Sequence, residues 1–137
     1  MILLDTNVIS EAQKTDGNAV VKRQVAAHQG EIVLSTVVLG EIRFGIEQLE
    51  PGARRTALEL FTAGLEADYA DRIYGIDLAI AYRWGRMRAA RRRRGRPLAL
   101  ADGLIAATAA VHDLTLWTRN AGDFQDLDIR VMNPWEG

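Results

Sequence analysis

Cysteine is absent from the 137-residue chain, and only two histidines, His28 and His112, are present. The first absence excludes disulfides and any site in which thiolates bind a metal. Two histidines cannot by themselves supply an ordinary structural zinc site. If this protein binds a metal, the ligands are therefore expected to be oxygen atoms.

Long apolar runs are missing as well. No stretch of the sequence is long and apolar enough to predict a membrane-spanning helix, and Asp5 interrupts the first apolar segment too early for a signal peptide. Hydrophobic residues make up 48% of the chain and charged residues 26%, values that are ordinary for a globular protein. We therefore expect one domain, residues 1–137, in the cytoplasm and without membrane contact.

Acidic residues are absent from residues 83–96, RWGRMRAARRRRGR, which contain eight arginines. Because the net charge is −1, the rest of the chain is strongly acidic, with nine basic residues against eighteen acidic ones. This asymmetry favours a polyanionic partner. The alternative is a solvated helix end, where arginines interact favourably with the helix dipole. The basic segment alone does not decide between them.

Apolar strand patterns alternate with helical patterns along the chain. This alternation predicts a parallel sheet with helices on both faces, a three-layer α/β/α fold. In such folds ligands bind beyond the carboxyl ends of the strands, where Asp5 and the residues after Trp117 are expected. The predicted strands are residues 1–4, 31–37, 72–76, 115–118 and 128–132, and the predicted helices are residues 20–28, 38–49, 51–67, 78–94 and 99–112.

Asp102 lies in an unusually apolar segment. Residues 98–111 read LALADGLIAATAAV, in which Asp102 is the single charge and Thr108 is the only other polar side chain. A helix that is apolar on nearly every side is normally buried. A buried carboxylate without a countercharge is unfavourable, so Asp102 should be paired, protonated or bound to a metal. The alternative is that Asp102 caps the start of this helix.

Three further acids have simple individual explanations. Asp5 lies in the turn-forming sequence DTN, Asp123 lies in the loop-like RNAGDF, and Glu41 flanks the apolar face of the predicted helix 38–49. If they converge with Asp102 at one sheet edge, their repulsion requires protonation or a bridging cation. Oxygen ligands favour Mg²⁺ or Mn²⁺ over zinc, and such sites are suited to phosphoryl transfer.

Four segments, found in this order, resemble the motifs of PIN-domain ribonucleases, specifically the FitB-like side of the VapC-type toxins of bacterial toxin–antitoxin pairs. They are LLDTNVISE, STVVLGEIRFGI, LALADGLIAATA and TRNAGDF, and together they extend from the first predicted strand almost to the last. The resemblance implies a five-stranded parallel sheet between layers of helices, in agreement with the pattern of the residues.

Carried over position by position, the resemblance makes Asp5, Glu41 and Asp102 the core catalytic acids. Asp123 is the implied fourth acid, and Asn120 could share its role. These acids would bind Mg²⁺, with Mn²⁺ as a substitute, and whether one or two ions are used stays open.

Two threonines, Thr6 and Thr118, match polar positions that support the acids or the attacking water. In addition, the charge of Arg91, Arg92, Arg93 and Arg94 suggests contacts with the RNA backbone.

The implied function is that of a Mg²⁺-dependent endoribonuclease and toxin, in which activated water attacks phosphorus in line. The products would carry 3′-hydroxyl and 5′-phosphate ends, and the sequence does not name the RNA target. The implied partners are a VapB-like antitoxin, the RNA substrate and a second copy of the chain. A toxin–antitoxin hetero-oligomer that binds operator DNA through the antitoxin is a further expectation.

Three alternatives were weighed. A phosphatase of the haloacid dehalogenase type needs a second aspartate two positions after Asp5, where Asn7 stands. A receiver domain needs a lysine near its last strands, and the only lysines are Lys14 and Lys22. A PIN-fold regulatory partner that controls the DNA binding of an antitoxin, with little nuclease turnover, stays open.

Overall fold

A five-stranded, fully parallel sheet forms the centre of the protein, and the computed structural model describes all of residues 1–137. The strand order is β3-β2-β1-β4-β5, so the first strand lies in the middle. The predicted α/β class and the five parallel strands are confirmed. The strands are β1 (Ile2–Leu4), β2 (Ile32–Ser35), β3 (Ile73–Tyr74), β4 (Thr115–Trp117) and β5 (Arg130–Met132).

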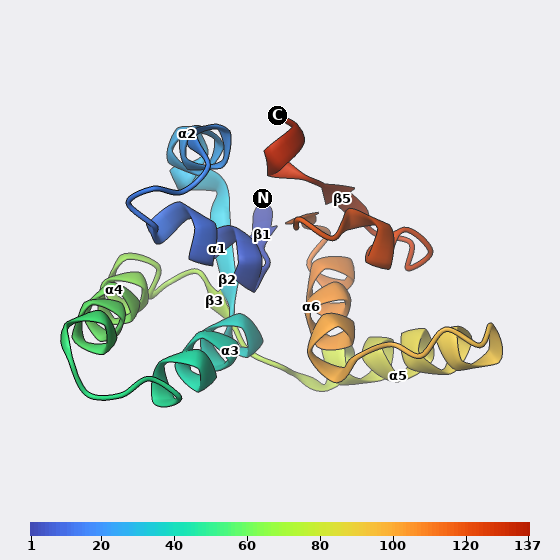
Figure 1. Cartoon of the computed structure of the whole chain (residues 1–137). Helices are drawn as coiled ribbons and strands as arrows, with labels where there is room; N and C mark the ends of the chain where they lie inside the picture. The colour runs from blue at the N-terminus through green and yellow to red at the C-terminus, as the bar shows by residue number, and fades with distance from the viewer.

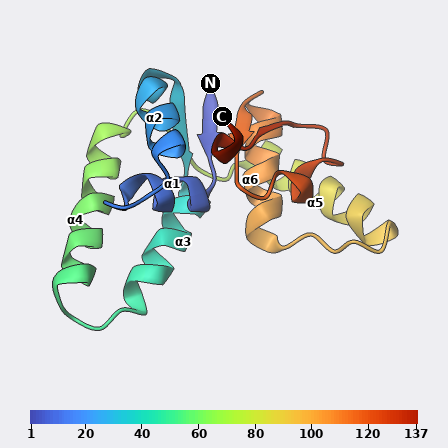
Figure 2. The same ribbon diagram turned by 45° about the horizontal axis from the view of Figure 1, so that its top comes forward.

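Helices cover both faces of this sheet. The chain runs outward from β1 to β2 and β3 and then crosses back to β4 and β5 on the other side of β1. Because the crossovers are right-handed, the helices that connect β1, β2 and β3 lie on one face of the sheet, and those that lead to β4 lie on the other. Figures 1 and 2 show α2 and α4 on one side of the strands and α5 and α6 on the other. The helices are α1 (Thr6–Gln13), α2 (Ala19–Ala27), α3 (Thr36–Glu47), α4 (Ala53–Asp68), α5 (Leu78–Arg93) and α6 (Leu100–Val111).

Helix caps set the boundaries that hydrophobic periodicity placed less well. The strand predicted over 31–37 ends at Ser35, because the Ser35 hydroxyl accepts a hydrogen bond from the amide of Val37 (3.1 Å) and caps α3. The helix expected to begin at Pro51 begins at Ala53, after Gly52 as the N-cap residue. The predicted cap of α5 is confirmed, because Asp77 accepts from the amide of Ile80 at 2.9 Å.

The hydrophobic core lies on both sides of the two central strands. Every residue of β1 and β2 is buried, as expected for parallel strands covered on both faces. Helix α6 contributes the longest buried segment, from Ile105 to Ala109, and its small side chains let α5 pack closely against it. The sheet and α6 are therefore the rigid base on which the residues at the strand ends are held.

Gly103 marks the closest approach between α5 and α6. A Cβ atom at this position would lie 2.7 Å from Cδ1 of Trp84, whereas a Cβ at Gly45 on α3 would meet nothing within 4 Å. We expect Gly103→Ala to destabilise the protein by about 2 kcal/mol through overpacking. In contrast, Gly45→Ala should stabilise it by about 0.5–1 kcal/mol through helix propensity. Urea unfolding of both variants measures the difference, and equal effects would contradict the close packing at Gly103.

No helix combines the length and the apolar character that crossing a membrane requires.

Candidate active site

Asp5 is a buried carboxylate at the carboxyl end of β1, with an exposed fraction of 6%. One carboxylate oxygen accepts a hydrogen bond from the amide of Thr6 (2.8 Å), which makes Asp5 the N-cap residue of α1. The other oxygen accepts from the hydroxyl of Thr118 at 2.8 Å. The turn interpretation of DTN is therefore correct as local structure, and the cap orients the carboxylate that the sequence nominated for the site.

The position of Thr118 beside Asp5 follows from strand register. Strands β1 and β4 are hydrogen-bonded neighbours, with Leu4 paired to Trp117, so the residues that follow them lie next to each other. The amide of Asp5 donates to the carbonyl of Trp117 at 2.9 Å, which continues the pairing past the end of β1. The chain leaves β1 towards β2 on one side and reaches β4 on the other, so this is the switch point where open α/β sheets bind ligands.

Glu41 is held beside α1 by one short hydrogen bond. It lies in the middle of α3, is partly buried, and accepts a hydrogen bond of 2.5 Å from the hydroxyl of Thr6. The two residues are thirty-five positions apart in the sequence, and helices α1 and α3 bring them together. Thr6 and Thr118 each hold one acid, as expected for supporting polar residues.

Asp102 lies in the first turn of α6 and is not its cap, because Ala99 is the N-cap residue. The alternative interpretation as a capping aspartate is therefore wrong. Burial and the negative charges of Asp5, Glu41 and Asp123 together raise the pKa of Asp102, and only Arg91 opposes them. The charges of the other three predicted acids therefore act on Asp102 and raise its pKa.

Asp123 comes from a short 3-10 turn, η2 (Ala121–Phe124), between β4 and β5. Its side chain is exposed, whereas the next residue, Phe124, is 1% exposed and anchors the turn in the core. Asn120 precedes the turn, and its main-chain amide donates to the hydroxyl of Thr118 at 3.1 Å. Thr118 therefore connects Asp5 to the turn that carries Asp123.

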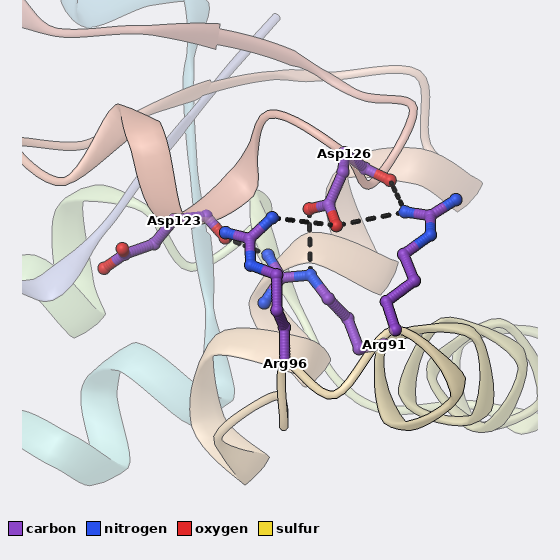
Figure 3. Close-up of polar contacts among 5 residues, drawn as sticks. Arg91, Arg96, Asp123 and Asp126 are labelled. Atoms are coloured by element: carbon purple, nitrogen blue, oxygen red, sulfur yellow. Dashed lines mark hydrogen bonds and ion pairs between the residues drawn. The ribbon is translucent and has the colours of Figure 1, made fainter.

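The arginines of the basic segment do not form one uniform surface. Arg91 is only 5% exposed, and its guanidinium donates to the carboxylate of Asp126 and to the main-chain carbonyl of Asp123. Figure 3 shows this cluster, in which Asp126 also binds Arg96. Arg91 is therefore unavailable to an RNA phosphate, which corrects the prediction for this residue. Nothing in the sequence distinguishes Asp126 from other loop acids, and it was not among the predicted site residues.

Arg94 is exposed but also donates to Asp126, at 3.0 Å. Arg92 and Arg93 are exposed on the last turn of α5. Of the four arginines predicted to contact RNA, Arg92 and Arg93 are therefore the two that are exposed and not paired with Asp126.

The donor chemistry of the site suits Mg²⁺ or Mn²⁺, which prefer carboxylate oxygen ligands. The raised pKa of Asp102, caused by burial and by three neighbouring carboxylates, shows a concentration of negative charge that a cation would relieve. As the side chains stand, however, no group of three or more acidic or histidine residues could hold a metal ion. Binding would therefore require carboxylates of this set to rotate towards one another.

The sequence and the fold match those of a known family. The family model of the PIN domain matches residues 2–129. The chain belongs to the PIN domain family. The matched range includes all four acids.

This PIN domain is 37% identical to Toxin FitB of Neisseria gonorrhoeae over 140 residues, which cover 98% of this chain and 99% of that protein. It is 35% identical to VapC ribonuclease Y4jK of Sinorhizobium fredii over 141 residues, with 99% of each chain covered. A structure of FitAB bound to an IR36 DNA fragment matches with a TM-score of 0.91 at 35% identity, covering 98% of this chain and 96% of that chain. The predicted resemblance to FitB-like, VapC-type toxins is confirmed.

Proposed function

We propose that this PIN domain is a metal-dependent endoribonuclease and the toxin of a toxin–antitoxin pair. The observation that carries the proposal is the placement of four acids, Asp5, Glu41, Asp102 and Asp123, near the switch point of the sheet, where burial and then the charges of the other three raise the pKa of Asp102. Similarity over nearly the whole chain to proteins named as a toxin and as a ribonuclease supports the same conclusion. RNA in the cytoplasm is the proposed substrate.

Asp5 and Asp102 would hold the divalent cation, and Glu41 and Asp123 would complete its inner or outer coordination shell. The cation, Mg²⁺ or Mn²⁺, would offset the charge of the scissile phosphate and make the attacking water more acidic. The protein orients the carboxylates that would bind the cation. The hydroxyl of Thr118 and the amide of Thr6 fix both oxygens of Asp5.

Each remaining acid has a distinct environment. The hydroxyl of Thr6 holds Glu41, which links α1 to α3 beside the site. The ionised form of Asp102 is disfavoured, because burial and then the charges of its neighbours raise its pKa. A nearby cation would favour that form.

The proposed partners follow from the relatives. The matched FitAB structure contains DNA, and we assign to this chain a VapB-like antitoxin that covers the acidic site and carries the pair to operator DNA. Exposed apolar residues on α5, Leu78 at 66% and Tyr82 at 61%, support a homodimer. Exposed Arg92 and Arg93 are the proposed contacts with the RNA backbone.

The test of the nuclease proposal is metal-dependent cleavage of RNA. The purified chain, freed of metal with EDTA, is incubated with total cellular RNA alone, with Mg²⁺ and with Mn²⁺. We expect cleavage only after a metal is added, and fragments with 5′-phosphate ends. The Asp102→Asn variant, purified in parallel, controls for contaminating ribonucleases.

Two outcomes would overturn the nuclease proposal: no cleavage with either metal, or equal cleavage by the variant. The chain would then be a regulatory PIN-domain partner of an antitoxin, without turnover.

A further inference from the structure

Arg91 is a buried arginine whose guanidinium is bonded to other residues of the protein and not to solvent. A buried guanidinium is unfavourable unless its donors are bonded and its charge is paired. The Nε donor of Arg91 lies 2.8 Å from Oδ1 of Asp126, and one terminal nitrogen donates to the carbonyl of Asp123. The bonds of Arg91 therefore join the last turn of α5 to the segment that carries Asp123.

Among the three arginines that surround Asp126, Arg91 is the one that is buried. Its side chain is 6% exposed, whereas those of Arg94 and Arg96 are each 55% exposed. Solvent-exposed ion pairs contribute little because water and salt screen them. Burial raises the pKa of Asp126, but the hydrogen bonds of Arg91 and Arg94 and the charge of Arg91 outweigh burial and lower it. Asp126 is therefore the anion paired with the buried Arg91.

The turn that carries Asp123 has few other restraints. Within η2 and the residues after it, the amide of Asp123 donates to the carbonyl of Asn120 at 2.9 Å, and the amide of Leu127 donates to the carbonyl of Phe124 at 3.2 Å. Phe124 and Leu127 bury their side chains in the core. The bond from Arg91 is the restraint that acts on the main-chain carbonyl of Asp123.

The direction of the Asp123 side chain follows from this restraint. In Figure 3 the carbonyl of Asp123 faces Arg91, while its carboxylate points away from the arginine cluster. The charge of this carboxylate is one of the causes, after burial and the charges of Asp5 and Glu41, that raise the pKa of Asp102. Holding the carbonyl on one side thus directs the carboxylate to the other.

We propose that Arg91, fixed by Asp126, is a positioning residue that holds η2 so that the carboxylate of Asp123 serves the metal site. The inference rests on the proposed function, since it assigns the turn a role in metal binding. Arg91 touches neither metal nor RNA in this scheme and acts only through Asp123. Its effect should therefore disappear when Asp123 can no longer serve as a charged ligand.

The experiment is a double-mutant cycle read by Mn²⁺ binding in a calorimeter, without RNA. We expect Arg91→Gln to weaken Mn²⁺ binding about tenfold, as loss of a group that orients a ligand does. In an Asp123→Asn background, Arg91→Gln should cause no further loss. Arg130→Gln breaks the Arg130–Asp113 ion pair of 2.9 Å elsewhere and should leave Mn²⁺ affinity unchanged. An equal loss in both backgrounds, or no loss in either, would overturn the proposal.

Arg91→Lys separates geometry from charge. Lysine keeps the positive charge but lacks the planar fork that bonds Asp126 and the carbonyl of Asp123 together. We expect it to lose as much Mn²⁺ affinity as Arg91→Gln, and wild-type affinity would show that charge alone matters. If Arg91→Gln does not fold, Asp126→Asn gives the same test, because it releases Arg91 and should weaken Mn²⁺ binding in the same direction.

The failure of this proposal differs from that of the nuclease proposal. A wild-type chain that binds Mn²⁺ but shows no coupling between positions 91 and 123 overturns only the positioning role. A wild-type chain that binds no Mn²⁺ overturns both.

Discussion

Asp102→Asn is expected to lower RNA cleavage on the order of a thousandfold while making the metal-free protein more stable. Metal ions contribute several kcal/mol to transition-state stabilisation in such sites, and each factor of ten in rate corresponds to about 1.4 kcal/mol. Asparagine removes the anionic ligand but nearly preserves its shape. The opposite directions of the two effects are the signature of a residue selected for chemistry at a cost in stability.

The gain in stability follows from the raised pKa of Asp102, which has burial and then the charges of Asp5, Glu41 and Asp123 as its causes. A carboxyl whose pKa is higher in the folded chain than in the unfolded chain binds its proton more tightly when folded. Its ionised form therefore destabilises the fold at pH values above the folded pKa, and this penalty fades as the pH falls through it. We expect Asp102→Asn to raise the melting temperature at neutral pH by about 3 °C, the shift that roughly 1 kcal/mol produces.

Melting curves between pH 4 and pH 8, recorded in EDTA, measure this difference, which should shrink as the solution becomes more acidic. The matched control is Asp128→Asn, an exposed aspartate with a positive φ of 56° that asparagine tolerates. Saturating Mn²⁺ should reverse the order of stability, because the metal stabilises only the chain that binds it. A variant that melts below the wild type at neutral pH in EDTA would contradict the repulsion assigned to Asp102.

Thr118→Val is expected to reduce cleavage by about 10–100-fold and to destabilise the fold by about 2 kcal/mol. Valine has the shape of threonine without the hydroxyl, which is fully buried and donates to Asp5 at 2.8 Å. The substitution leaves a buried carboxylate oxygen without its donor. It also removes the acceptor for the amide of Asn120, and so loosens the connection to η2.

Two controls isolate this effect. Thr108→Val removes another fully buried hydroxyl, which donates to the carbonyl of Leu104 at 2.8 Å, and should leave cleavage unchanged. Thr118→Ser keeps the hydroxyl and should retain most of the activity. Equal activity of Thr118→Val and Thr108→Val, measured with Mg²⁺ on the same RNA, would show that the bond to Asp5 does not support catalysis.

Most local elements were predictable because their signals are local, although helix α1 (Thr6–Gln13) was not among the predicted helices. The alternation of strands and helices gave the parallel sheet, and Asp77 was recognised as a cap because a cap involves residues three positions apart. Boundaries shifted at Ser35 and at Pro51, where turn and cap geometry compete with the apolar period. Asp102 was identified from one charge in an apolar helix, which is a property of the sequence alone.

The relations between distant residues were not predictable in this way. Nothing near Thr6 indicates that its hydroxyl binds Glu41, since only the packing of α1 against α3 brings them together. In the sequence, residues 91–94 form one basic run, but burial gives Arg91 a role that exposed Arg92 does not share. A helix turn places successive side chains about 100° apart, so neighbours in such a run face different surroundings.

The sequence by itself determined the fold class, because the alternation of strand and helix patterns is local, and it nominated the four acids through motifs that resemble those of a known family. Only the tertiary structure decided how those acids are supported. The register of β1 with β4 placed Thr118 on Asp5, and the packing of α5 against the chain after β4 placed Arg91 on Asp126. Such contacts depend on how elements that are far apart in the chain pack against each other, and the local pattern of residue types does not specify that packing.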